Sequence, residues 1–127
     1  MNIKYILLSI TLLGFAFSEC ENPDESEYYI VCDGGSSQSE VIWALSPGNL
    51  NGGAPYSETV CLPNGHYTLM MSDTGNNGWN GNTWKIYDAL NSNLISGCTL
   101  DYGNFDSCPF FLGEVEDCSD YWGESAC

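Results

Sequence analysis

The sequence predicts an all-β protein: an antiparallel β-sandwich of jelly-roll-like class, bonded by disulfides, with an acidic cysteine-containing C-terminal tail. Three observations lead to this prediction. Short runs rich in β-branched and aromatic residues alternate between apolar and polar positions with a period of two. Glycine, proline and asparagine separate these runs, and no stretch of a dozen residues has the pattern of a capped amphipathic helix. Seven cysteines supply candidate crosslinks.

The first 18 residues have the features of a secretory signal peptide. Lys4 gives a positive start, residues 6–17 are mostly apolar, and Ala16-Phe17-Ser18 is a small-x-small cleavage site. An apolar run of about a dozen residues is too short to span a bilayer, which needs about 20. We therefore expect cleavage after Ser18, a secreted, extracellular or cell-surface location, and no membrane insertion.

Seven strands are expected in the mature chain, which the pattern divides into a β-sandwich domain at 19–112 and an acidic tail at 113–127. Each expected strand ends at residues that supply the dihedral angles of tight turns, such as Asp33-Gly34-Gly35, Pro63-Asn64-Gly65 and Asn77-Gly78. The expected strands are 29–31, 41–45, 59–62, 67–71, 83–87, 94–95 together with 98–100, and 108–112. Short strands at near-regular spacing are typical of a sandwich or jelly roll.

The cysteines indicate a disulfide framework, because no pair has the C-x₂-C spacing of a zinc site. The candidates are Cys20, Cys32, Cys61, Cys98, Cys108, Cys118 and Cys127. An odd number leaves one cysteine over, and we expect it near a terminus, at Cys20 or Cys127. That thiol is either buried or available for self-association through an intermolecular bridge, and bridges from Cys118 and Cys127 are expected to tie down the tail.

The charge of the chain restricts its partners. It has 17 Asp and Glu against two Lys and Arg, for a formal net charge of −15. Removal of the signal peptide leaves Lys85 as the only Lys or Arg. Binding to nucleic acid or to an anionic membrane surface needs clusters of basic residues, so both are excluded. We expect the partner to be an extracellular protein or a glycan.

Nothing in the sequence indicates an enzyme. His66 is the only histidine, arginine is absent, and neither G-x-S-x-G nor H-E-x-x-H occurs. Pairs of carboxylates carry no information in a chain with so many of them. No catalytic residue and no required cofactor are therefore assigned.

The segment 72–84 is the densest candidate for a site, and calcium is the first possibility. Asp73, Asn77 and Gly78 match half of an EF-hand loop, and Asn80 or Asp88 are further oxygen ligands. Trp84 stands where that loop needs a glutamate, and no flanking helix is expected. The alternative interpretation is architectural, with Asp73 capping a turn through backbone amides.

Glycan binding is the second possibility for the same loop. Trp79 follows Gly78 outside any alternating strand, which makes it the best candidate for an exposed ring that stacks on a sugar. Asn77, Asn80 and Asn82 are the expected hydrogen-bonding partners of the sugar hydroxyls. The alternative is that Trp79 covers the end of the chain's own core.

Three segments resemble a known extracellular module. Residues 40–45 are similar to its motif E-T-S-W-x-L, residues 61–69 to C-L-P-x-G-x-Y-T-L, and residues 73–82 to D-S-Y-G-D-G-W-N-G-N. The module occurs in secreted proteins of ciliates, algae, oomycetes and marine bacteria. The resemblance covers residues 28–112 and implies a β-sandwich-like fold without established catalysis. Asn77 replaces the second acidic residue of the third motif, which weakens any cation site that the resemblance implies.

Together these features predict a secreted extracellular binding or structural module, such as a component of a cell-surface or filament assembly. Two other functions stay open. One is a small diffusible, pheromone-like signal that acts through a receptor, and the other is a glycan-binding module.

Overall fold

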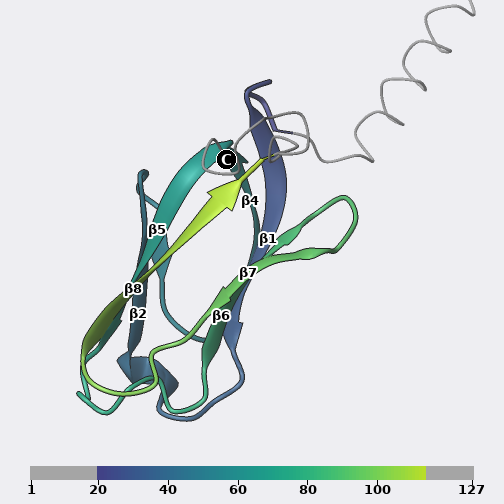
Figure 1. Cartoon of the computed structure of the whole chain (residues 1–127). Helices are drawn as coiled ribbons and strands as arrows, with labels where there is room; N and C mark the ends of the chain where they lie inside the picture. Colours follow the sequence, from purple (N-terminus) through teal and green to yellow (C-terminus); the bar gives the residue numbers. More distant parts are fainter. Residues whose placement is uncertain (1–19, 114–127) are drawn as a thin grey trace, which may run out of the picture.

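The computed structural model describes residues 20–113, which form two four-stranded antiparallel sheets packed face to face (Figure 1). The predicted antiparallel β-sandwich is confirmed. The strands are β1 (Glu25–Asp33), β2 (Val41–Ser46), β3 (Asn51–Gly52), β4 (Tyr56–Pro63), β5 (Gly65–Asp73), β6 (Thr83–Asp88), β7 (Leu94–Cys98) and β8 (Phe105–Leu112). A short 3₁₀ turn, η1 (Gln38–Glu40), precedes β2.

All seven predicted strands are present, and most are longer than their apolar runs. Residues 29–31, for example, are the middle of the nine-residue strand β1. Residues 99–100 lie beyond the end of β7, so that part of the prediction is wrong. The two-residue strand β3 was not predicted, because it has too few residues to display a period.

The chain passes repeatedly from one sheet to the other. The β1 sheet has the order β4-β1-β6-β7, and the β5 sheet has the order β3-β2-β5-β8. β5 and β6 belong to different sheets, so the connection between them, residues 74–82, closes one end of the sandwich (Figure 1). The β6–β7 hairpin lies toward the opposite end of β6 and extends away from the sandwich.

The core contains aromatic rings from both sheets. Trp43 and Trp84 are fully buried and meet edge to face, with ring centroids 5.9 Å apart. Alternation within β1 places Ile30 and Cys32 on this inner side, each with no exposed surface. Large rings bury about 150–250 Å² each, which offsets the small number of aliphatic residues in the chain.

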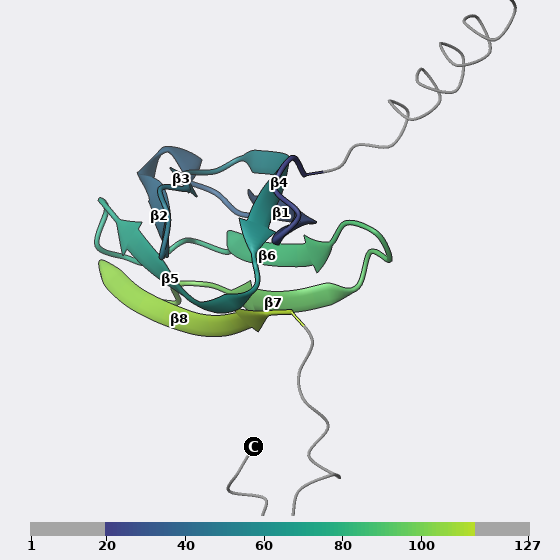
Figure 2. The same cartoon turned by 90° about the horizontal axis from the view of Figure 1, so that it is seen from above.

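Two disulfides stabilise the sandwich. Cys20–Cys61 attaches the residues before β1 to the edge strand β4. Cys98–Cys108 joins β7 of the β1 sheet to β8 of the β5 sheet, which lie side by side (Figure 2). Crosslinks of this kind stabilise a fold mainly by restricting the unfolded chain.

The prediction for the leftover thiol is wrong at Cys20, which is bonded. Among residues 20–113 the free cysteine is Cys32, which is buried in the core. Cys118 and Cys127, the predicted signal peptide at 1–18 and the rest of the predicted tail beyond Gly113 lie outside the described residues. Within 20–113, no helix has the length and apolar character needed to cross a membrane.

Candidate functional site

The segment 72–84, which contains the loop 74–82, was the main candidate site in the sequence, and the contacts of Asp73 near its start are architectural. The Asp73 carboxylate accepts hydrogen bonds from the backbone amides of Gly75 (3.0 Å) and Asn77 (2.7 Å). Desolvation raises the pKa of this carboxyl, but the bonds from Asn77, Gly75 and Gly78 outweigh it, so the pKa lies below its ordinary value. Asp73 is 4% exposed and holds the start of the loop in place, as the architectural alternative anticipates.

Of the two interpretations of Trp79, the exposed ring that stacks on a sugar is wrong. Its side chain has no exposed surface, and its indole nitrogen donates to the carbonyl of Ser72 at 2.8 Å. The Trp79 amide also donates to the carbonyl of Leu100 at 2.7 Å, which attaches the loop to the segment after β7. Trp79 therefore covers the end of its own core and presents no ring face to a sugar.

Asn82 is buried as well, and its side chain has no free hydrogen-bonding capacity. Its oxygen accepts from the amide of Gly35 and from Gln38, and its nitrogen donates to the carbonyls of Ser36 and Trp79. A Cβ at Gly35 would collide with the backbone of the loop, so only glycine fits where these two segments pass each other. Asn82 thus ties the loop to the segment between β1 and η1, and it is not available to a ligand.

The other two candidate glycan ligands in the loop, Asn77 and Asn80, are exposed. Asn80 adopts a left-handed conformation (φ 53°), and its carbonyl accepts the amide of Ser36. Because Trp79 is buried, this loop presents no exposed aromatic ring beside Asn77 and Asn80, and Asn82 is buried as well. The glycan site predicted at Trp79, Asn77, Asn80 and Asn82 is not assembled.

The calcium site predicted at Asp73, Asn77 and Asp88 is not assembled either. Asp88 is the sixth and last residue of β6, at the end of the strand away from the loop that follows Asp73. A strand of that length spans about 20 Å, far beyond a single coordination sphere. Within residues 20–113 no group of three or more His, Cys, Asp or Glu side chains is placed to hold a metal ion.

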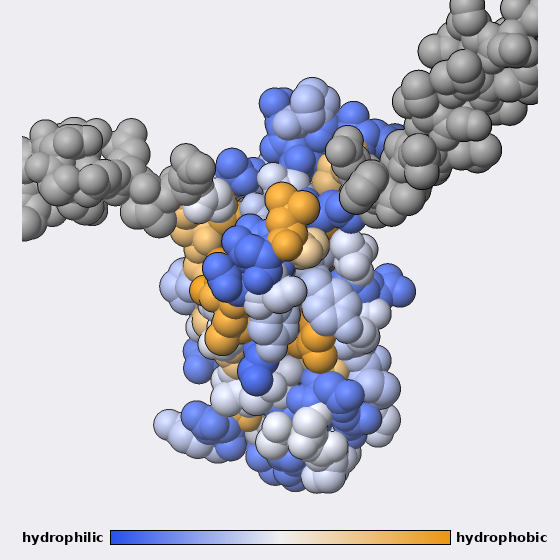
Figure 3. All heavy atoms as spheres, turned by 90° about the vertical axis from the view of Figure 1, so that its right-hand side faces the viewer, coloured by the Kyte–Doolittle hydropathy of each residue, from blue (hydrophilic) through white to orange (hydrophobic). Residues whose placement is uncertain are grey.

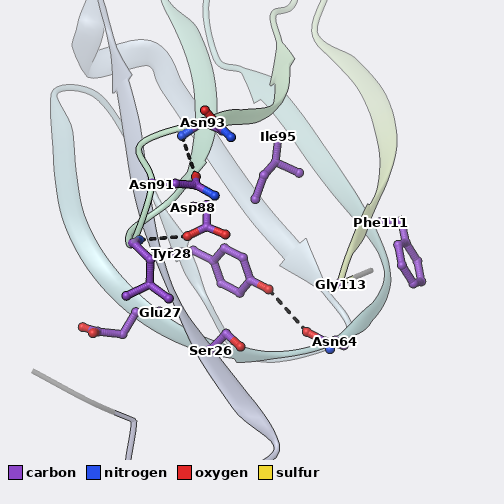
Figure 4. Close-up of a pocket in the computed structure, with 11 residues that line it drawn as sticks. Ser26, Glu27, Tyr28, Asn64, Asp88, Asn91, Asn93, Ile95, Phe111 and Gly113 are labelled. Atoms are coloured by element: carbon purple, nitrogen blue, oxygen red, sulfur yellow. Dashed lines mark hydrogen bonds between the residues drawn. The ribbon is translucent and has the colours of Figure 1, made fainter. Parts of the chain in front are cut away.

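A pocket of about 620 Å³ lies at the other end of β6, beside the β6–β7 hairpin (Figure 4). We call it the hairpin pocket. Its lining combines amides, carboxylates and a hydroxyl with aromatic and aliphatic groups. The lining residues are Ser26, Glu27, Tyr28, Asn64, Asp88, Leu90, Asn91, Asn93, Ile95, Phe111 and Gly113.

Hydrogen bonds fix the shape of the hairpin. The Asp88 carboxylate accepts the amide of Leu90 at 2.8 Å, and the side-chain oxygen of Asn91 accepts the amide of Asn93 at 2.9 Å. Each bond uses one oxygen of its side chain. The second oxygen of Asp88, the amide nitrogen of Asn91 and the side chain of Asn93 make no hydrogen bond within residues 20–113 and remain available to a ligand.

The inner wall of the pocket is held by Tyr28. Its hydroxyl donates to the side-chain oxygen of Asn64, in the turn between β4 and β5, at 3.3 Å. Burial raises the pKa of Tyr28, a hydrogen bond with Ser26 lowers it, and the charge of Asp88 raises it further. The net pKa is above the ordinary value, so the phenol keeps its proton at neutral pH and stays a donor.

A second hollow, of about 430 Å³, lies on the outer face of the β1 sheet and also borders Asp88. We call it the tyrosine groove. Tyr29 and Tyr87 face each other across β1 and β6 with ring centroids 6.3 Å apart, and the hydroxyl of Tyr29 is hydrogen-bonded to Ser57. On the side of the molecule that bears the hairpin, hydrophobic and hydrophilic residues are interspersed (Figure 3).

Sequence reasoning did not identify the hairpin pocket. Tyr28, Asn64 and Phe111 come from β1, the β4–β5 turn and β8, and no local pattern relates them. The signal in the sequence was the segment 88–93, in which Asp88, Asn91, Ser92 and Asn93 are polar.

Comparison with models of protein families, with curated proteins and with solved structures found no match for this chain. The resemblance carried by residues 40–45, 61–69 and 73–82 therefore stays a prediction. The first and third of these segments do lie together, since the amide of Thr74 donates to the carbonyl of Glu40 at 3.2 Å.

Proposed function

We propose that this chain is a secreted extracellular binding module and that the hairpin pocket is its site for a neutral glycan. The observation that carries the proposal is the composition of the pocket. Amides of Asn91 and Asn93 both donate and accept, as sugar hydroxyls do, and the same lining contains Tyr28, which is 4% exposed, and the exposed aliphatic side chains of Leu90 and Ile95. Such a combination fits a ligand that is polar at its edges and apolar on its faces.

The charges of the pocket narrow the ligand further. Asp88 and Glu27 line it, and no Lys or Arg does. Carboxylates accept hydrogen bonds from hydroxyl groups, but they repel uronic, sialic and sulfated sugars. The proposed ligand is therefore uncharged.

Secretion is supported by the two disulfides, which persist in oxidising compartments. A covalent assembly of copies is a weaker possibility, because Cys32 is buried and cannot reach a second chain. Only Cys118 and Cys127 remain for such a bridge, and both lie outside the described residues. Electrophoresis with and without reductant separates a covalent assembly from a monomeric binding module or a diffusible signal.

A glycan array probed with the oxidised, secreted protein tests the proposal. We expect binding to neutral glycans and none to sialylated or sulfated ones. For the best neutral glycan, Asn93→Ala removes a hydrogen-bonding side chain of the exposed hairpin, and we expect about tenfold weaker binding.

The matched control is Asn49→Ala, which removes an equally exposed amide from the turn between β2 and β3. It should bind as the unmodified protein does. An array without any neutral hit, or equal loss of binding in the two variants, would contradict the proposed site.

A further inference from the structure

The outer face of the β5 sheet carries no charge, in a chain where charge is otherwise abundant. We call it the uncharged face. Strand register places its side chains in cross-strand rows: Ile42, Ser72 and Phe105 in one, and Ala44, Met70 and Ser107 in the next. The remaining outward positions of β2, β5 and β8 hold no Asp, Glu, Lys or Arg.

Much of this face is apolar and open to solvent. Phe105 is 59% exposed, Ile42 46% and Met70 36%. Phe111 and His66 continue the face at its far end, with ring centroids 4.8 Å apart. The one carboxylate of β8, Asp106, pairs with the inward-pointing Met71 and so does not have the outward register of this face.

The outer face of the other sheet is different. The outward positions of β1 that flank Tyr29 and Val31 are Glu27 and Asp33, and Lys85 lies opposite Val31 on β6. A contact between two copies of this second face would place carboxylates near carboxylates. Of the two sheet surfaces, only the uncharged face allows one copy to approach another without this cost.

We infer that the uncharged face is the contact surface of a twofold dimer of this chain. A twofold contact brings the same patch of both copies together, so a charged patch would meet its own charge, whereas an uncharged apolar patch is complementary to itself. Two sheets packed in this way stand about 10 Å apart and exclude water from Ile42, Met70 and Phe105.

The size of the face sets the strength of the dimer. Strand spacing and residue rise give roughly 400 Å² per copy, about half of a standard protein interface. The contact is therefore weak, and the dimer forms only at high protein concentration. Carboxylates elsewhere on the two copies repel each other, and salt screens this repulsion. Added salt should strengthen the dimer, the reverse of its effect on an interface built from ion pairs.

Analytical ultracentrifugation of the full chain, from about 10 μM to about 1 mM protein, measures the association directly. We expect a monomer–dimer equilibrium whose dissociation constant falls on the order of tenfold between low and high salt. Met70→Glu, at the centre of the face, should weaken the dimer at least about tenfold, because the twofold axis brings two new carboxylates together. Phe105→Glu should have the same effect.

Leu94→Glu is the control, since it adds the same charge at a residue of similar exposure (55%) on β7 of the other sheet. It should dimerise as the unmodified chain does, and urea unfolding checks that all three variants remain folded. A full chain that stays monomeric at the highest protein and salt concentrations overturns the inference. Equal weakening by Leu94→Glu and Met70→Glu also overturns it, and neither result bears on glycan binding at the hairpin pocket.

Discussion

The indole nitrogen of Trp79 donates to the backbone carbonyl of Ser72 at 2.8 Å, across the loop that joins the two sheets. Trp84, which belongs to the same core, is equally buried, yet its indole nitrogen has no hydrogen-bond partner. The two tryptophans therefore differ in polar contacts and not in exposure.

This difference predicts unequal costs for the same substitution. Phenylalanine at either position removes part of a buried ring, but only Trp79→Phe also removes a hydrogen bond, while Trp84→Phe removes a buried donor that was already unpaired. We expect Trp79→Phe to lower the free energy of unfolding by about 1–2 kcal/mol more than Trp84→Phe does. Urea unfolding of both variants measures it, and a larger loss in Trp84→Phe would contradict the assigned contacts.

Asn82 provides a second comparison within the same loop. Asn82→Asp keeps the shape of the side chain but turns its two donated hydrogen bonds into contacts between a buried carboxylate and the carbonyls of Ser36 and Trp79. We expect a loss of at least about 3 kcal/mol in unfolding free energy. Asn80→Asp introduces the same charge at an exposed residue of the loop and should cost far less. Similar costs for the two variants would mean that Asn82 is not held as described.

Asp73 makes the stability of the fold depend on pH. Hydrogen bonds hold the pKa of its carboxyl below the ordinary value, against the opposing effect of desolvation. The native state therefore favours the ionised form: the stabilisation is complete above the pKa of the unfolded chain and is lost as the pH falls through the native pKa.

We expect Asp73→Asn to be less stable than the unmodified chain at neutral pH and the difference to shrink as the solution is acidified. Thermal unfolding at a series of pH values measures this difference. Asp24→Asn removes the same charge from an exposed position and controls for net charge. A constant difference between Asp73→Asn and the unmodified chain would show that its ionisation is not linked to folding.

Cys32 should not react in the native protein. Burial, with a smaller effect from the charge of Asp33, raises the pKa of its thiol to about 12, so almost no thiolate exists at neutral pH. We expect iodoacetamide to modify the peptide that contains Cys32 only after unfolding, as peptide mapping by mass spectrometry would show. Cys32→Ser should cost about 1–3 kcal/mol, because it buries a hydroxyl in an apolar core. Rapid modification of the folded protein would place this thiol at the surface.

The strands and their inward faces could be predicted from the sequence, because alternation is a local property. The burial of Cys32 was within reach of the same rule, since it stands in phase with Ile30 on one face of β1. We expected the leftover thiol at a terminus because of its position in the chain. The alternation in β1 already indicated that the side chain of Cys32 points inward.

The loop and the pocket were beyond local reasoning for different reasons. Trp79 has no periodic neighbours, so its burial depends on Ser72 and Leu100, which only the folded chain brings to it. The predicted calcium site was wrong because the length of β6 separates Asp88 from Asp73. The hairpin pocket requires Tyr28 to meet Asn64, a contact between residues 36 positions apart that neither the β1–β4 register nor any motif indicates.

The burial of Cys32 also has a consequence for oxidative folding. A newly secreted chain with seven cysteines has seven ways to choose the one that stays reduced, and each wrong choice gives a misbridged product. Once β1 and β6 pair and enclose Cys32 between the sheets, disulfide isomerases and small thiols no longer reach it. Hydrophobic collapse, acting before any bridge forms, would in this way remove the odd thiol from the exchange and leave an even number to pair.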